Sequence, residues 1–148
     1  MTQANNIEQR IYDDNNIFAK MLNGDIPCHK VYEDDKTLAF MDIMPQAEGH
    51  VLVIPKQKAI DLGDLAPDYA AAVLMTAQKI MQAQRQVFAR DGIVQMQLNG
   101  AQAGQTVFHY HLHLIPSSIQ ELGRHAAIEV DHEQLAVIAE KLAAAIHC

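Results

Sequence analysis

Three histidines alternate with apolar residues in one short stretch of the chain, at His109, His111 and His113. In a β-strand, successive side chains point to opposite faces, so the three imidazoles share one face of a predicted strand. Alternate residues of a strand lie roughly 6.6 Å apart, which leaves room for a phosphate between two imidazole rings. The other face of this strand is apolar and is expected to pack into the protein. It consists of Tyr110, Leu112 and Leu114.

Three interpretations of this histidine face compete. The first is a set of hydrogen-bonded or solvated histidines without chemistry. The second is a metal site, because alternating histidines in a strand can bind zinc, with further ligands from elsewhere in the chain. The possible further ligands are His29, His50 and His125. The third is catalysis by a histidine nucleophile that its neighbours activate and orient.

A polar loop that contains glycines comes directly before the histidines, at residues 99–106. Its glycines allow a tight turn and a close approach of the backbone to a ligand. Asn99, Gln105 and Thr106 add side-chain donors for phosphate oxygens. Such a loop by itself is also typical of a plain hairpin turn. Beside three histidines it favours a phosphate site next to a nucleophile, which is the third interpretation.

The rest of the pattern predicts an α+β domain with an antiparallel sheet. Apolar residues recur at helical spacing in three segments and at strand spacing in five. Helices are predicted over residues 17–24, 67–89 and 135–146, and strands over 26–33, 37–41, 51–54, 93–98 and 108–115. We expect a polar leader over residues 1–15 and a single domain over residues 16–148, a length that suits one core.

The composition is that of an ordinary soluble domain, with 49% hydrophobic and 20% charged residues. The net charge of −7 disfavours a broad electrostatic grip on nucleic acid, although an anionic ligand can still be bound locally. No apolar run approaches the roughly 20 residues that span a bilayer, and the polar start is atypical of a signal peptide. The two cysteines, Cys28 and Cys148, do not form a disulfide framework. We therefore expect a cytoplasmic protein that binds neither nucleic acid nor membrane.

These features resemble the histidine-triad (HIT) family of hydrolases. The family signature alternates histidine with apolar residues, and HYHLHLI at residues 109–115 matches it. GQTV at residues 104–107 resembles the phosphate loop of the family, which adds Gly104 to the predicted phosphate-binding residues. Further matches between residues 17 and 116 are the segments IFAKMLNGDIP, LAFMDIMPQAEGH and VLVIPK. The resemblance therefore extends over most of the predicted domain.

The resemblance implies a role for each histidine. His111 would be the nucleophile that attacks the α-phosphorus and forms a nucleotidyl-histidine intermediate, which water then hydrolyses. His113 would bind a phosphate oxygen and offset negative charge in the transition state. His109 would orient and support the active imidazole by hydrogen bonding. The residues that resemble ligands of the phosphate and of the leaving group are Asn99, Gln105 and Thr106.

Four residues resemble the nucleoside pocket of the family, namely Ile26, Phe40, Asp42 and Ile43. The apolar members would hold the base, and Asp42 would contact the ribose hydroxyls. Phe40 and Ile43 are also compatible with a plain role in the core. A carboxylate within an apolar run is costly to bury without a partner, so a ribose diol is a sensible partner for Asp42.

The resemblance also implies a five-stranded antiparallel sheet and a two-fold homodimer, with the helix at residues 67–89 in the interface. Many microbial relatives bind structural zinc with a Cys-x-x-Cys pair near the first helix. The corresponding residues 16–19 read NIFA in this chain, so we expect neither a metal nor another cofactor. The chain also lacks the tryptophan that some eukaryotic members carry after the triad, which leaves the leaving-group preference open.

We therefore predict a nucleotide hydrolase that cleaves purine nucleoside phosphoramidates, of the adenosine 5′-phosphoramidate type, at the α-phosphate. A neutral imidazole is a good nucleophile near pH 7, and protonation of the amine eases cleavage of a P–N bond. A dinucleoside polyphosphate hydrolase of the same family is the first alternative. A metal-binding histidine cluster and a nucleotide-binding regulator without turnover are the others.

Overall fold

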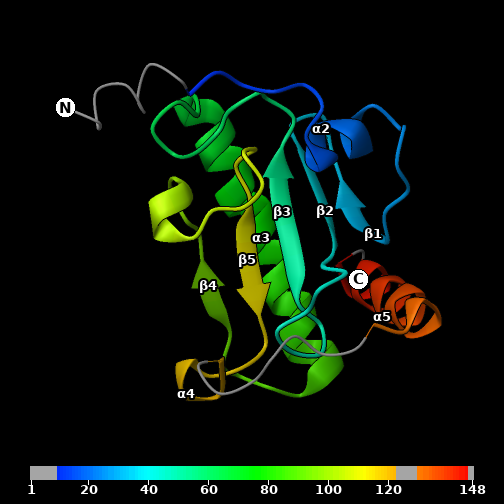
Figure 1. Cartoon of the computed structure of the whole chain (residues 1–148). Coiled ribbons are helices and arrows are strands. Elements are labelled where there is room, and N and C mark those ends of the chain that lie inside the picture. The colour runs from blue at the N-terminus through cyan, green and yellow to red at the C-terminus, as the bar shows by residue number, and fades with distance from the viewer. Residues whose placement is uncertain (1–9, 123–129, 147–148) are drawn as a thin grey trace.

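The computed structural model describes residues 10–122 and 130–146. Antiparallel strands form one five-stranded sheet in the order β1-β2-β3-β5-β4, with the long helix α3 along one face (Figure 1). This architecture confirms the predicted α+β fold and five-stranded sheet. The elements are α2 (Ile17–Leu22), β1 (Lys30–Glu33), β2 (Thr37–Met41), β3 (Val51–Pro55), α3 (Pro67–Phe88), β4 (Val94–Met96), the 3-10 helix η1 (Ala101–Ala103), β5 (Leu112–Ile115), α4 (Ile119–Leu122) and α5 (His132–Ile146).

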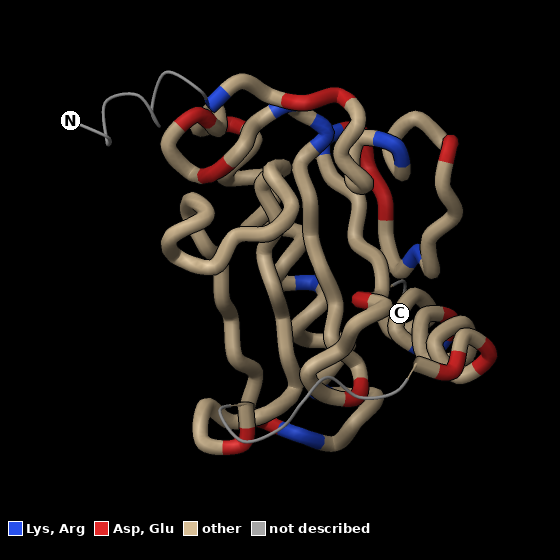
Figure 2. Tube along the Cα trace, in the orientation of Figure 1, with Lys and Arg blue, Asp and Glu red and all other residues tan. Residues whose placement is uncertain are grey.

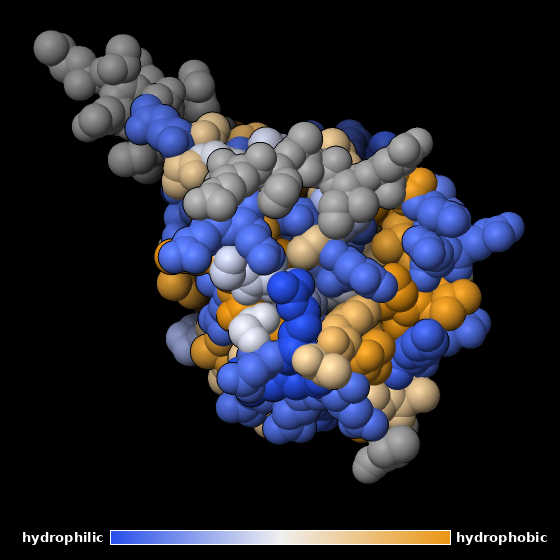
Figure 3. Space-filling model, turned by 90° about the horizontal axis from the view of Figure 1, so that it is seen from below, coloured by the Kyte–Doolittle hydropathy of each residue, from blue (hydrophilic) through white to orange (hydrophobic). Residues whose placement is uncertain are grey.

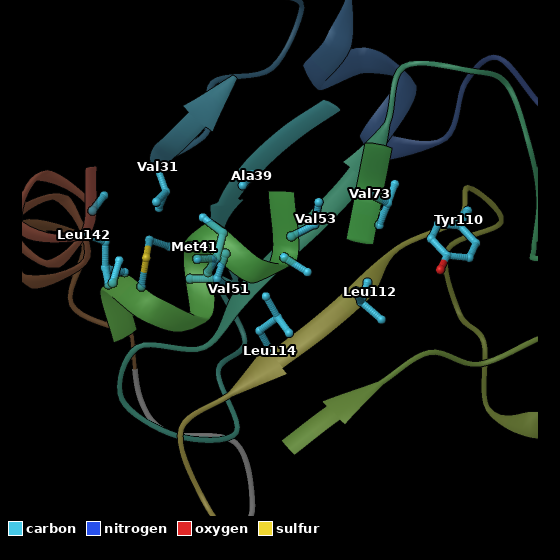
Figure 4. Close-up of a cluster of buried hydrophobic side chains, with 14 of the residues drawn as sticks. Val31, Ala39, Met41, Val51, Val53, Val73, Tyr110, Leu112, Leu114 and Leu142 are labelled. Carbon is cyan, nitrogen blue, oxygen red and sulfur yellow. The ribbon is translucent and has the colours of Figure 1, made fainter. Parts of the chain in front are cut away.

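The central strands alternate between two hydrophobic clusters, one on each face of the sheet. Val51 and Val53 of β3 pack with residues of α3 and α5, whereas Leu52 and Ile54 pack with residues of α2. His113 is opposite Leu52 in the register, so it lies on the α2 face. The hydrophobic cluster that contains residues of α3 and α5 also includes Tyr110, Leu112 and Leu114 (Figure 4). The predicted division is therefore confirmed for the apolar residues and for His113.

The histidine stretch is only partly a strand. β5 begins at Leu112 rather than at residue 108, because the residues before it are not paired in the sheet. The backbone N–H of Tyr110 instead donates to the carbonyl of Ala59 at 2.8 Å, in the segment after β3. His109 and His111 therefore lie in the loop before β5, and His113 lies within the strand.

Side-chain hydrogen bonds fix α2 and α3 to the rest of the fold. Asn16 caps α2, and its side chain accepts the backbone N–H of Ala19 at 2.9 Å. Gln84 of α3 is fully buried and donates to the carbonyls of Gly49 and Leu114, at 2.8 and 3.0 Å. Gln84 thus ties α3 to the start of β3 and to β5.

Several predicted bounds differ from those observed. The first strand begins at Lys30 instead of residue 26, and the C-terminal helix begins at His132 instead of residue 135. The short helix α4 after β5 was not expected from the sequence. His125, Cys148 and residues 1–9 of the predicted leader lie outside the described residues.

Charged residues of both signs are spread along the described chain without a continuous basic track (Figure 2). Seen from below, one face carries many hydrophilic side chains, with hydrophobic ones toward one side (Figure 3). This distribution favours a locally bound anionic ligand over a polyanion. Within residues 10–122 and 130–146, no helix has both the length and the apolar character to span a membrane.

Candidate active site

A backbone hydrogen bond and a ring contact fix the orientation of His111. Its Nδ1 lies 2.7 Å from the backbone carbonyl oxygen of His109. Because a carbonyl oxygen only accepts hydrogen bonds, Nδ1 of His111 carries the ring proton and Nε2 keeps its lone pair. Nε2 makes no hydrogen bond to the described part of the chain, and the residue retains 9% of its surface. Phe18 of α2 supports the ring edge-on, with the ring centroids 5.0 Å apart.

His109 is fully buried, and both of its ring nitrogens are occupied. Nε2 lies 2.8 Å from the carbonyl oxygen of Pro55 and therefore donates its proton there. Nδ1 then accepts from the hydroxyl of Tyr12, at 2.6 Å. The ring is closed to a substrate, and the group that orients His111 is the backbone carbonyl. This geometry agrees with the orienting role that the resemblance implies for His109.

His113 contacts a fourth histidine, His50. Nδ1 of His50 accepts the backbone N–H of Gln46 at 3.0 Å, so the neutral His50 ring carries its proton on Nε2. That Nε2 lies 2.9 Å from Nδ1 of His113 and donates to it. His113 consequently keeps its own proton on Nε2, where it is available as a hydrogen-bond donor. The rings of His111 and His113 lie edge to face with centroids 5.1 Å apart, so the two imidazoles are neighbours.

Burial keeps these four imidazoles neutral near pH 7, because the charged ring is poorly solvated inside the protein. It lowers the pKa of His50 and of His109 to about 4 and the pKa of His113 to about 3. Burial also lowers the pKa of His111, against the opposite effects of the His109 carbonyl and of Asp42. A neutral imidazole with a free ring nitrogen is the form that can act as a nucleophile.

Asp42, directly after β2, extends the network on the His50 side. Its Oδ1 accepts the backbone N–H of Met44 at 2.8 Å, and its Oδ2 lies 3.4 Å from Nε2 of His50. The ligand atoms of Asp42, His50 and His113 all lie within 4.8 Å of one another, a spacing that also suits a cation. The metal interpretation therefore has a defined location, although the hydrogen bonds between these groups account for their arrangement as well.

Gln105 fixes the shape of the loop before the histidines. Its side chain is 3% exposed and accepts the backbone N–H of Gly100 at 2.7 Å. Its two amide hydrogens go to the carbonyls of Ile60 and Val107, at 2.6 and 3.1 Å. Gln105 thus braces the loop with donors already in use inside the protein, and a direct contact with phosphate stays a prediction.

The other predicted loop residues lie at the surface. Asn99 is exposed, and its side-chain oxygen accepts the backbone N–H of Leu62 at 2.9 Å. Gly104 follows η1, and its N–H donates to the carbonyl of Ala101 at 3.0 Å. Thr106 is exposed. These three residues are accessible to a ligand, and their contact with one stays a prediction.

One segment positions both the loop and the histidines. The carbonyls of Pro55, Ala59 and Ile60 accept hydrogen bonds from His109, Tyr110 and Gln105. The loop and the triad are therefore fixed to the same stretch of chain, from the end of β3 to Ile60.

The predicted nucleoside-pocket residues lie at different depths. Phe40 is 2% exposed and packs edge-on against Phe18, the residue that supports His111, with centroids 5.4 Å apart. Ile43 is 43% exposed in the turn after β2, and Ile26 is half-buried between α2 and β1. Phe40 is a core residue beneath the site, whereas Ile26 and Ile43 retain apolar surface that a base would cover.

Two residues beside the triad escaped the prediction of site residues. The sequence pointed to His50 only as a metal ligand, and Tyr12 lies within the predicted leader. His50 comes directly before the most apolar predicted strand, a position that could have marked it as a site residue. Tyr12 could have been noticed as the only aromatic residue among the first 16. His29, the other described histidine considered as a ligand, lies against His132 instead, with Nε2 and Nδ1 2.9 Å apart.

Known proteins are similar to this chain in sequence and in fold. The family model of the HIT domain matches residues 23–120. Protein hit of Bacillus subtilis is 44% identical over 103 residues, which are 70% of this chain and 71% of that protein. Adenosine 5′-monophosphoramidase hnt1 of Schizosaccharomyces pombe is 39% identical over 107 residues, which are 72% of this chain and 77% of that protein.

The fold agrees with solved structures of this kind. The crystal structure of a Hit-like protein from Bartonella henselae superposes with a TM-score of 0.82 and 45% sequence identity, over 91% of this chain and 99% of that chain. The triad, the sheet and the similarity along the chain lead to one assignment. This chain belongs to the HIT family, the histidine-triad hydrolases that its sequence resembles.

Proposed function

We propose that the protein hydrolyses purine nucleoside phosphoramidates, such as adenosine 5′-phosphoramidate, at the α-phosphorus with His111 as nucleophile. The observation that carries this proposal is the 2.7 Å hydrogen bond from Nδ1 of His111 to the carbonyl of His109. It leaves the lone pair of Nε2 free beside the donor His113. The similarity to an adenosine 5′-monophosphoramidase supports this class of substrate.

The reaction would proceed by two displacements at phosphorus. In the first, the lone pair of Nε2 of His111 forms a bond to the α-phosphorus, the P–N bond of the substrate breaks, and the departing amine takes up a proton. In the second, water attacks phosphorus and loses a proton, and the bond between phosphorus and Nε2 breaks. Nucleoside monophosphate is released, and His111 returns to its neutral form.

The surroundings of His111 support both displacements. The ring becomes positively charged when it carries the nucleotidyl group, so its hydrogen bond to the His109 carbonyl strengthens at that stage. The Nε2–H of His113 would donate to a non-bridging oxygen of the phosphate. Both groups are already in place before the substrate arrives, which lowers the reorganisation that the reaction requires.

Asp42 would bind the ribose of the substrate. Its carboxylate is 15% exposed, and the 3.4 Å separation from His50 leaves oxygen lone pairs for the two hydroxyls. The apolar surfaces of Ile26 and Ile43 would cover the base.

A dinucleoside polyphosphate is the alternative substrate within the same mechanism. It would form the same nucleotidyl-His111, and a second nucleotide would leave in place of the amine. Asn99 and Thr106 are exposed, and the resemblance implies that they bind the phosphate and the leaving group. Both substrates are therefore compared in one experiment.

The test is AMP release from adenosine 5′-phosphoramidate and from diadenosine polyphosphates in the presence of EDTA. We expect His111→Ala to lower turnover by at least roughly 10³-fold, because no other group replaces the nucleophile. Mass spectrometry of the wild-type protein, taken shortly after it is mixed with substrate, should detect the nucleotidyl adduct. His132→Ala is the matched control, since His132 contacts His29 rather than the triad. Full activity in His111→Ala, or no turnover of either substrate, would refute the covalent mechanism.

Chelation separates the hydrolase from the metal-binding alternative. A cation held by Asp42, His50 and His113 would be removed by EDTA, and zinc or manganese would restore the activity. We expect no dependence, because both the nucleophile and the donor are imidazoles of the chain. A regulator without turnover would bind AMP and give no reaction that depends on His111.

We also propose that the protein is a cytoplasmic homodimer. The helix α3, which the resemblance places in the dimer interface, leaves Leu74 50% and Met75 63% exposed. A second copy of the chain would cover these apolar side chains.

A further inference from the structure

The N-terminal strap, residues 10–14, is joined to the segment after β3 and to the triad by three side-chain contacts. The guanidinium of Arg10 pairs with the buried carboxylate of Asp61. The hydroxyl of Tyr12 bonds to His109. Asp14 pairs with Lys58 at 2.7 Å. Figure 1 shows this blue segment crossing one end of the sheet before it reaches α2.

The contact of Tyr12 with His109 has a defined direction. The proton of His109 is on Nε2, which donates to the carbonyl of Pro55, so Nδ1 needs a donor. The hydroxyl of Tyr12 provides it at 2.6 Å, and the two rings lie edge to face with centroids 5.6 Å apart. Burial raises the pKa of Tyr12, so the hydroxyl keeps its proton across the neutral range.

Tyr12 is two hydrogen bonds away from the nucleophile. Its hydroxyl fixes the ring of His109, and the backbone carbonyl of His109 accepts the Nδ1 proton of His111. With the ring of His109 held at both nitrogens and fully buried, the plane of its carbonyl is fixed as well. The direction of that carbonyl determines where the lone pair of Nε2 of His111 points.

We propose that Tyr12 is a positioning residue for His111, which acts through His109 and fixes the direction of the nucleophilic nitrogen. This inference rests on the proposed function for its kinetic consequence, since it concerns the same site. Tyr12 itself does not touch the substrate. Its expected effect is therefore on the rate of reaction at saturation and not on substrate binding.

The variant Tyr12→Phe removes one hydroxyl and keeps the aromatic ring in place. We expect kcat for adenosine 5′-phosphoramidate to fall about 2- to 12-fold, which corresponds to the loss of one hydrogen bond, with KM within about twofold of the wild-type value. Tyr32→Phe is the matched control, because the Tyr32 hydroxyl also donates one side-chain hydrogen bond, to the carboxylate of Asp34 at 3.0 Å, away from the triad. The control should keep the wild-type kcat.

Ring nitrogen signals give a second readout that does not depend on turnover. In ¹⁵N–¹H correlation spectra of the histidine rings, wild-type protein should show His109 protonated at Nε2 and His111 protonated at Nδ1. Tyr12→Phe should shift the Nδ1 signal of His109 and should also perturb the Nδ1–H signal of His111. Tyr32→Phe should leave both signals unchanged.

The outcomes separate this inference from the proposed function. A wild-type spectrum with the His109 proton on Nδ1 overturns the inference without any variant. An unchanged kcat in a folded Tyr12→Phe protein overturns it too, whatever the spectrum shows. If the wild-type protein does not turn over the phosphoramidate, the proposed function fails. The Nδ1–H signal of His111 then decides whether Tyr12 positions this ring. A shift on removal of the Tyr12 hydroxyl supports positioning, and an unchanged signal contradicts it.

Discussion

Three of the four imidazoles of the site take their proton position from a backbone group, and His113 takes its own from the ring of His50. Carbonyls of residues 55 and 109 accept from His109 and His111, and the N–H of Gln46 donates to His50. Backbone groups do not exchange their donor and acceptor roles, so the tautomers are set by the path of the chain. The result is a free lone pair on His111 next to an N–H donor on His113.

The pH dependence of stability follows from the buried rings. His50 and His109 have pKa values of about 4 in the folded protein, against about 6.5 in the unfolded chain. Between these pH values the unfolded chain binds more protons than the folded protein. The contribution of these two histidines to the free energy of unfolding is therefore complete above about pH 6.5, and it is lost as the pH falls toward about 4. The expected slope is about 1.4 kcal/mol per pH unit for each such histidine. Urea unfolding at several pH values measures it, and constant stability across this window would contradict the burial of neutral rings.

Substitution at Asp42 tests the ribose contact. We expect Asp42→Asn to raise KM for adenosine 5′-phosphoramidate by about 10-fold with a smaller effect on kcat, because a charged acceptor of two hydroxyls becomes a weaker neutral one. A substrate without the 2′- and 3′-hydroxyls provides the control. The variant and the wild-type protein should process it with similar KM, and an undiminished difference would place Asp42 elsewhere in the mechanism.

At the scale of elements, one close approach joins the end of α3 to the turn before β3. Gly49 has a φ of 85°, and a Cβ built there would lie 2.3 Å from the ring of Phe88. Gly49→Ala should therefore lower the free energy of unfolding by about 2–4 kcal/mol, from steric overlap and backbone strain together. Gly24→Ala is the matched control, since it has φ 81° and open space around it. It should cost about 1 kcal/mol, and equal losses in denaturant titration would refute the steric contribution.

The same turn carries His50, which couples the elements to the site. Gly49 lets the chain pass close to Phe88, and Gln84 of α3 holds the carbonyl of Gly49 at 2.8 Å. The packing of α3 against the start of β3 therefore fixes the position of the His50 ring. Because His50 donates to His113, the helix α3 on the opposite face of the sheet also helps to hold His113 in place.

At the scale of the whole molecule, we expect two chains to associate through α3. Met75→Glu places a charge on the exposed apolar surface of this helix, and it should convert a dimer of the 16.4 kDa chain into a monomer. Light scattering after gel filtration measures the mass. Val137→Glu on α5 is the control, since Val137 is also about half exposed, at 48%. A monomeric wild-type protein, or an unchanged mass of Met75→Glu, would contradict this interface.

The sequence by itself determined the fold class, the family and the two faces of the histidine stretch. These follow from local periodicity, because a period of two sends Leu112 and Leu114 to the core and His113 to the opposite face. The long helix α3 and the buried strand β3 were equally predictable, since each is a continuous pattern between clear stop signals.

Only the tertiary structure decided how the histidines are held. β5 begins only at Leu112, and the N–H of Tyr110 just before it donates to Ala59 outside the sheet. The Tyr12–His109 and His50–His113 bonds join residues that are 97 and 63 positions apart in the chain. The local pattern of apolar and polar residues indicates which face of a segment is buried. It does not indicate which distant group donates or accepts the hydrogen bonds of that segment. The proton positions of the triad are therefore a property of the assembled fold.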